Sequence, residues 1–163
     1  MISFITFQAY QHEDDISSIS INGDTIASGG GDEKCVVRSI PKKQLLYSTS
    51  HILPVECVQL LPDSSLGFNL ITSSLGGPVK LWRNGELVKS LQHSCTCWRF
   101  DLDKTNRLLA VANVVGVTVW RIDNFEKIGE EEIGVTMDVR FNAASTKIIA
   151  VTMYGKVYEI ALE

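Results

Sequence analysis

The sequence lacks any long hydrophobic run, and no stretch approaches the roughly 18 apolar residues of a membrane-spanning helix. Its first residues, MISFITF, also lack the basic segment and the cleavage pattern of a signal peptide. Basic residues are not in excess, because 15 lysines and arginines stand against 19 acidic residues, for a net charge of −4. These absences argue against membranes and nucleic acid as partners and favour a cytoplasmic or nuclear location.

Cysteine is sparse, with 4 residues in the chain. Without a secretory signal, we expect these to be reduced thiols rather than a disulfide framework. The chain has 163 residues, 45% of them hydrophobic and 21% charged. That length and composition are typical of one globular domain.

Motifs that carry catalysis are also missing. The segment Gly29–Asp32 is rich in glycine, but no Lys-Ser/Thr pair follows it, so it predicts a turn and not a phosphate-binding loop. The best candidate metal site is His93, Cys95 and Cys97, which alternate on an expected strand and would therefore share one face. A fourth ligand is lacking. We therefore expect structural thiols and a packing histidine, with no enzyme activity, no cofactor and no metal, and keep a metal or redox site as the alternative.

What the sequence does contain is an internal repeat. Short apolar segments follow turn-like segments four times, and Ile21, Leu60, Phe100 and Phe141 mark equivalent points with spacings of 39, 40 and 41 residues. A second set of landmarks, at the end of an alternating run, keeps a similar period: Arg38, Trp82, Trp120 and Ile160. A period near 40 residues that carries three or four short strands is typical of β-propeller blades.

The segment LGGPVKLWRNGE, residues 75–86, shows the local chemistry of such a repeat. Asn84-Gly85 favours a type I′ turn, so Val79–Arg83 and Glu86–Leu91 should form a hairpin. Helical patterning is weak, since only Asp123–Glu132 has a helix-like composition and Gly129 interrupts it. The sequence therefore predicts an all-β fold.

The repeats resemble the WD40 family. The resemblance covers nearly the whole chain and rests on IASGGGDEKCVVRS (26–39), LLPDSS…LITSSLGGPVKLWR (60–83) and RFDLDKTNRLLAVA…GVTVWR (99–121). The chain departs from the family pattern directly after the tryptophan, where the family usually has aspartate and repeats two and three have arginine. The resemblance implies a hydrogen-bonded set of His, Ser or Thr, Asp and Trp within each blade, and no repeat has all four. The structural blade positions that remain are Asp32, His51, Trp82, His93 and Trp120.

The number of repeats leaves ring closure open. We expect one propeller domain over 1–163, with repeats at about 11–48, 49–91, 92–131 and 132–162 and an N-terminal strand at 4–10 that completes the last blade. Four blades are few for this family. Closure could be a four-bladed ring, an eight-bladed ring from two chains, or a half-ring completed by another protein, and we favour the homodimer.

Function is then expected to lie in the surface. The resemblance implies a non-catalytic WD-repeat scaffold that binds proteins through the propeller face and rim; the alternative is a propeller enzyme or metal-binding protein that uses His93, Cys95 and Cys97. Two acidic clusters fall in expected loops between repeats. Their residues are Glu13, Asp14 and Asp15, and Glu130, Glu131 and Glu132. They are either ordinary solvated loop charges or a surface that attracts a basic protein partner.

Overall fold

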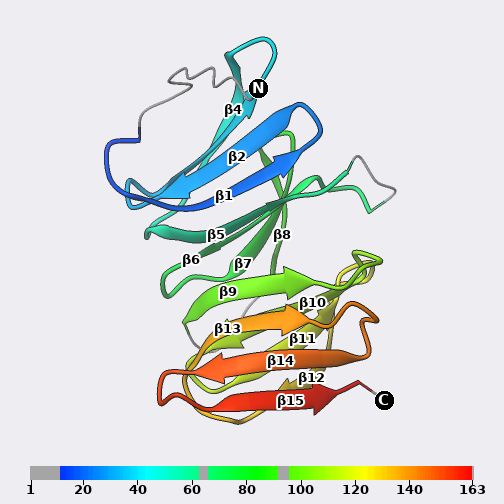
Figure 1. The fold of residues 1–163 in the computed structure, drawn as a ribbon. Coiled ribbons are helices and arrows are strands. Elements are labelled where there is room, and N and C mark those ends of the chain that lie inside the picture. Colours follow the sequence, from blue (N-terminus) through cyan, green and yellow to red (C-terminus); the bar gives the residue numbers. More distant parts are fainter. Residues whose placement is uncertain (1–11, 63–65, 92–95, 163) are drawn as a thin grey trace, which may run out of the picture.

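The computed structural model describes residues 12–62, 66–91 and 96–162. These ranges form β-strands throughout and contain no helix, so they hold no helix that could cross a membrane. The strands make four antiparallel sheets, each a meander of strands adjacent in the sequence. Figure 1 shows the sheets following one another in chain order, from the first at the top to the last at the bottom. The all-β prediction is confirmed, and this arrangement is compatible with a β-propeller.

Each sheet starts with an innermost strand and proceeds outward. The first sheet contains β1 (Ile16–Asn22), β2 (Thr25–Gly30), β3 (Lys34–Ser39) and β4 (Gln44–Ser50). The second contains β5 (Val55–Leu60), β6 (Leu70–Ser74), β7 (Val79–Arg83) and β8 (Glu86–Leu91). The third contains β9 (Cys97–Leu102), β10 (Leu108–Asn113), β11 (Val117–Arg121) and β12 (Glu126–Glu131). The last contains β13 (Thr136–Phe141), β14 (Lys147–Thr152) and β15 (Val157–Ala161), and has three strands within the described residues.

The hairpin expected around Asn84-Gly85 is present with the predicted strand bounds. Strands β7 and β8 pair antiparallel, and Arg83 lies opposite Glu86. Asn84 and Gly85 have φ values of 50° and 92°, as a type I′ turn requires. Local turn chemistry therefore sets this register.

Three apolar clusters fill the spaces between successive sheets. The middle sheets are buried on both faces, so neighbouring residues of one strand enter different clusters: Leu70 packs toward the first sheet and Ile71 toward the third. Leu109 and Ala110 divide in the same way between the second and last sheets. This explains why a strand such as β10, with the sequence LLAVAN, is apolar on both faces.

The first and last sheets do not pack together as successive sheets do. Innermost strands of neighbouring sheets lie against each other, as β1 does against β5 and β9 against β13. Within the described ranges, no comparable packing joins β1 to β13, and Figure 1 places the two sheets at opposite ends of the row.

The observed pairing corrects one landmark of the repeat. The four residues of the second landmark do occupy equivalent positions, because each lies opposite the corresponding residue of the second strand in its own sheet. They are Arg38, Trp82, Trp120 and Ile160. In the third sheet, however, Leu102 and not Phe100 is equivalent to Leu60. The expected strand at 4–10 lies outside the described residues.

Candidate partner-binding site

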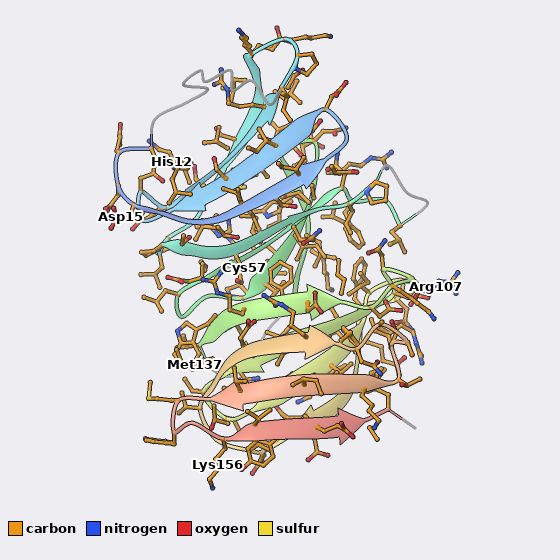
Figure 2. All side chains as sticks on the ribbon, in the orientation of Figure 1. His12, Asp15, Cys57, Arg107, Met137 and Lys156 are labelled. Carbon is orange, nitrogen blue, oxygen red and sulfur yellow. The ribbon has the colours of Figure 1, made fainter. Side chains whose placement is uncertain are left out.

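The meander topology gives every sheet two different loop edges. Turns that join the first strand to the second, and the third to the fourth, share one edge. The opposite edge, here called the loop edge, carries the segments that enter each sheet and the turns between second and third strands. Figure 2 shows His12, Asp15, Met137 and Lys156 on this side and Arg107 on the other.

In the first sheet, a buried hydrogen-bonded set lies beneath the loop edge. His12 Nδ1 is 2.8 Å from Asp32 Oδ1, and His12 Nε2 is 2.8 Å from Ser28 Oγ. The backbone N–H of Glu13 also donates to Asp32. Burial alone would raise the pKa of Asp32, but the hydrogen bonds from His12 and Glu13 lower it below 3.8. The set ties the entering segment to the turn after β2.

The second sheet has an equivalent set with different members. Trp82 Nε1 donates to Thr72 Oγ1 at 2.8 Å, and Thr72 Oγ1 lies 3.2 Å from His51 Nε2. The rings of His51 and Trp82 meet edge to face at 5.5 Å. Burial, helped by the positive charge of Lys80, lowers the pKa of His51 to about 4, so the ring is neutral at pH 7.

This set lacks a carboxylate. Gly76 occupies the position that Asp32 has in the first sheet, and buried Nδ1 of His51 has no hydrogen-bond partner among the described residues. Thr72 supplies the hydroxyl of this set, whereas the neighbouring Ser73 donates to the carbonyl of Trp98. Both histidines, His12 and His51, are buried in these sets.

The possible metal ligands His93 and Cys95 lie outside the described residues. Cys97 is fully buried in the core between the second and third sheets, where Trp120 also packs. Across the described parts of the chain, no group of three or more His, Cys, Asp or Glu side chains could hold a metal ion.

The loop edge of the second sheet bears a hollow that sequence reasoning missed. It has a volume of about 260 Å³ and is lined by Ile52, Leu53, Ser74, Gly76, Gly77, Pro78 and Lys80. Ile52 is 87% exposed, and Leu53 and Leu75 are also exposed. The N–H of Leu75 donates to the carbonyl of Pro54 at 2.9 Å, which holds the two loops together. The signal available in the sequence was an apolar pair, Ile52-Leu53, in a segment between two strands.

Exposed apolar loop residues concentrate on this edge. Besides those around the hollow, Met153 and Tyr154 are exposed in the turn before β15. On the opposite edge, the described turns expose no large apolar side chain to this degree. A hollow of about 270 Å³ does lie on the opposite edge, beside Asn22, Leu46 and Asn84. The two edges therefore differ in the exposed apolar residues of their turns and not in having a hollow.

The acidic clusters lie at separate places along the row of sheets. Glu13, Asp14 and Asp15 are exposed before β1, and Glu13 pairs with Lys34 at 3.4 Å. The expectation of a second loop cluster was wrong in part, because Glu130 and Glu131 belong to strand β12 and only Glu132 follows it. Glu130 pairs with Lys127 at 2.6 Å. Within one chain, the structure does not bring the two clusters together.

Comparison with known proteins supports the fold alone. No known protein family and no curated protein matches the sequence. Among solved structures, the chain is similar to the computationally designed Ika4 protein, with a TM-score of 0.81, 18% identity and coverage of 94% of both chains. It is also similar to the computationally designed Ika8 protein, with a TM-score of 0.79 and 18% identity. The match to Ika8 covers 93% of this chain and 47% of the designed chain.

Proposed function

We propose that this chain is a non-catalytic, WD40-like propeller scaffold that binds a protein partner through its loop edge. The observation that carries the proposal is the exposed apolar group around Ile52, Leu53 and Leu75, which surrounds a hollow and has no counterpart in the described turns of the opposite edge. Contiguous apolar surface rimmed by polar groups is typical of protein-binding sites.

The rigid framework beneath the hollow supports this role. His51 and Thr72 tie the entering loop to the second strand, and the bond from Leu75 to Pro54 fixes the adjacent turn. A site on such a framework loses little conformational entropy on binding. The buried histidines serve the framework in this proposal and do not act on a substrate.

The decisive experiment compares two pairs of equally simple substitutions. Ile52→Asp with Leu53→Asp alters the loop edge, and Leu87→Asp with Val88→Asp alters exposed apolar residues of β8 away from it. We expect the first pair to reduce recovery of specific partners from extract at least about 10-fold and the second to leave it unchanged. Identical capture by both pairs, with both folded by circular dichroism, would contradict the proposal.

The acidic residues supply a second test of the partner's chemistry. If the partner is basic, replacing Glu130, Glu131 and Glu132 with lysine should slow its association, most strongly at low salt. Unchanged association rates at low ionic strength would remove these residues from recognition.

The metal-binding alternative has a test of its own. Stoichiometric zinc in purified protein, lost on Cys95→Ser, would favour a metal site at His93, Cys95 and Cys97 over the scaffold. We expect no bound zinc.

A further inference from the structure

The first sheet exposes Ile19, whose equivalents are buried in every other sheet. By strand pairing, Ile19 is equivalent to Val58, Phe100 and Val139. Those three pack against the preceding sheet and are 2%, 4% and 1% exposed, whereas Ile19 is 62% exposed. Ile21, equivalent to the buried Leu60, is exposed as well. The face of the first sheet is therefore built to receive a preceding sheet.

The last sheet shows the complementary pattern on its outward face. Val157 is 69% exposed, although its equivalents Cys35, Val79 and Val117 are almost fully buried under the following sheet. Val151 is exposed on the same face, where equivalent residues of the other sheets are buried. This face is therefore built to receive a following sheet.

Charged residues occupy matching positions in these two faces. In each internal interface, one residue of a third strand shares an apolar cluster with a partner from the next sheet: Val37 with Trp82, Leu81 with Trp120, and Val119 with Ile160. On the outward face of the last sheet, the third-strand position is Glu159, which pairs with Lys147 at 2.5 Å. On the first sheet, the partner position is Arg38, which donates to the carbonyl of Lys43 at 2.9 Å. Arg38 and Glu159, two side chains of opposite charge, thus stand where the internal interfaces have an apolar pair, and a partner face would let them pair with each other as well.

A backbone contact can continue across the open faces in the same way. Ser18 Oγ accepts a hydrogen bond from the N–H of Val58 in the next sheet at 3.1 Å. Asp138 has the position of Ser18 in the last sheet, and Ile19 has that of Val58 in the first. A carboxylate at position 138 is thus suited to accept from the N–H of residue 19.

We propose that a second copy of this chain covers both faces, with Ile19 on Val157 and Arg38 paired with Glu159 in two identical contacts. Within one chain the first and last sheets are too far along the row to meet (Figure 1). A two-fold dimer joins each last sheet to the first sheet of the other copy and leaves neither face open. The match to about half of the longer designed chain is in accord with such a doubled arrangement.

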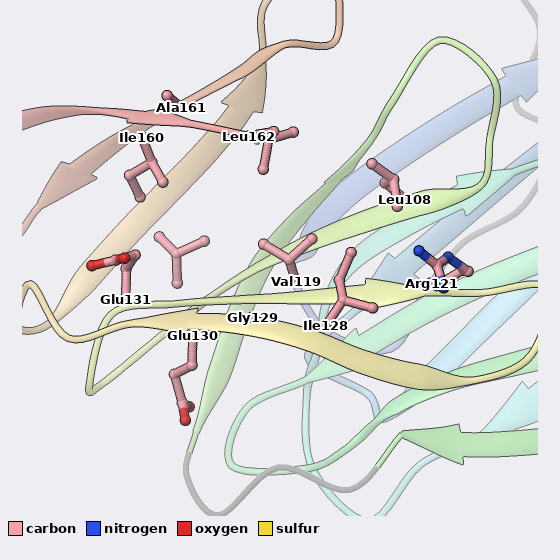
Figure 3. Close-up of a pocket in the computed structure, with 11 residues that line it drawn as sticks. Leu108, Val119, Arg121, Ile128, Gly129, Glu130, Glu131, Ile160, Ala161 and Leu162 are labelled. Atoms are coloured by element: carbon pink, nitrogen blue, oxygen red, sulfur yellow. The ribbon is translucent and has the colours of Figure 1, made fainter.

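A groove beside the last sheet suits the same partner. It has a volume of about 380 Å³ and lies between β12 and β15, with Val119, Ile128, Ile160 and Leu162 among its lining (Figure 3). Elsewhere the outermost strand of one sheet leads into the innermost strand of the next, as β4 leads into β5. The edge of β15 that borders this groove has no fourth strand among the described residues.

Charge exchange tests the interface directly. Arg38→Glu and Glu159→Arg should each place like charges at both contacts and weaken dimerisation at least about 100-fold. The double variant Arg38→Glu/Glu159→Arg restores opposite charges and should dimerise again. The measurement is sedimentation equilibrium of each protein over a range of concentrations, with circular dichroism to confirm folding.

Two further variants complete the design. Ile19→Glu should also give a monomer, and Leu87→Glu, a comparably exposed residue of the second sheet, should stay dimeric. Monomeric wild type, dimeric single variants, or a double variant no better than the singles would each overturn the proposal. The inference rests on the proposed propeller scaffold, but its failure is distinguishable: loss of the dimer leaves the loop-edge capture test unaffected, and failure of capture leaves the dimer intact.

Discussion

Ile19 and Val58 occupy the same register position in successive sheets, and only Val58 is covered. Val58 packs with Ala27, Cys35 and Val37 of the first sheet, whereas no described residue of the chain covers Ile19 in that way. One repeated sequence pattern thus produces one buried and one exposed side chain, because no sheet of the described residues covers this face of the first sheet. A large exposed apolar face of this kind is costly in water and typical of an interface.

Ser20→Ala should destabilise the protein by about 1 to 3 kcal/mol, because it leaves a buried N–H without a partner. Ser20 Oγ accepts from the N–H of Leu60 at 2.9 Å, and Asp101 makes the equivalent bond to Phe141 two sheets later. The free energy of unfolding in urea measures the effect. Ser48→Ala, at an exposed position of β4, is the control and should change it by less than about 0.5 kcal/mol. Equal effects would mean that the inter-sheet bond adds nothing.

Asp32→Asn should cost about 1 to 3 kcal/mol at pH 7, because the buried carboxylate accepts from His12 and from the N–H of Glu13. The lowered pKa means that this stabilisation is present above pH 3.8 and is lost as the pH falls through the folded pKa. Asp24→Asn, on the exposed turn before β2, serves as the control. A loss no larger than the control's would show that the hydrogen-bonded set does not stabilise the sheet.

His51 should make the protein acid-sensitive over a defined range. Its folded pKa of about 4 is below the unfolded value of 6.5, so the unfolded state binds the proton first. Stability is therefore full above pH 6.5 and falls by at most about 3 kcal/mol as the pH decreases toward 4. Urea unfolding at a series of pH values measures this slope. His51→Gln removes the titrating group and should flatten it; an unchanged slope would assign the acid sensitivity to other groups.

Deleting residues 1–10 should cause aggregation or loss of solubility. The edge of β15 is without a fourth strand in the described residues, and an unpaired strand edge is prone to associate. Light scattering and thermal unfolding compare the truncated and full chains. A truncated protein with the parent's melting temperature and solubility would exclude residues 4–10 as the closing strand.

The sequence predicted those features that depend on local chemistry. The hairpin at Asn84-Gly85 follows from turn preferences. The contact of His51 with Trp82 was implied by the resemblance to WD40 repeats. Neither requires knowledge of the neighbouring sheets.

Features that depend on pairing between strands were harder to predict. Glu130 and Glu131 have low strand propensity, yet they pair with Thr118 and Val117, so tertiary context overrides composition. Phe100 and Leu102 alternate on one face, and only the pairing of Leu102 with Leu109 decides which is equivalent to Leu60. The hollow depends on two loops that meet through Leu75 and Pro54, which no local pattern specifies.

The molar mass of the wild-type chain in dilute solution tests the central claim most directly. Light scattering should give twice the chain mass of 18.0 kDa, with no binding of an apolar dye, because each copy covers the faces of Ile19 and Val157 on the other. A stable species of 18.0 kDa that binds no such dye would contradict the dimer and favour a ring closed within one chain.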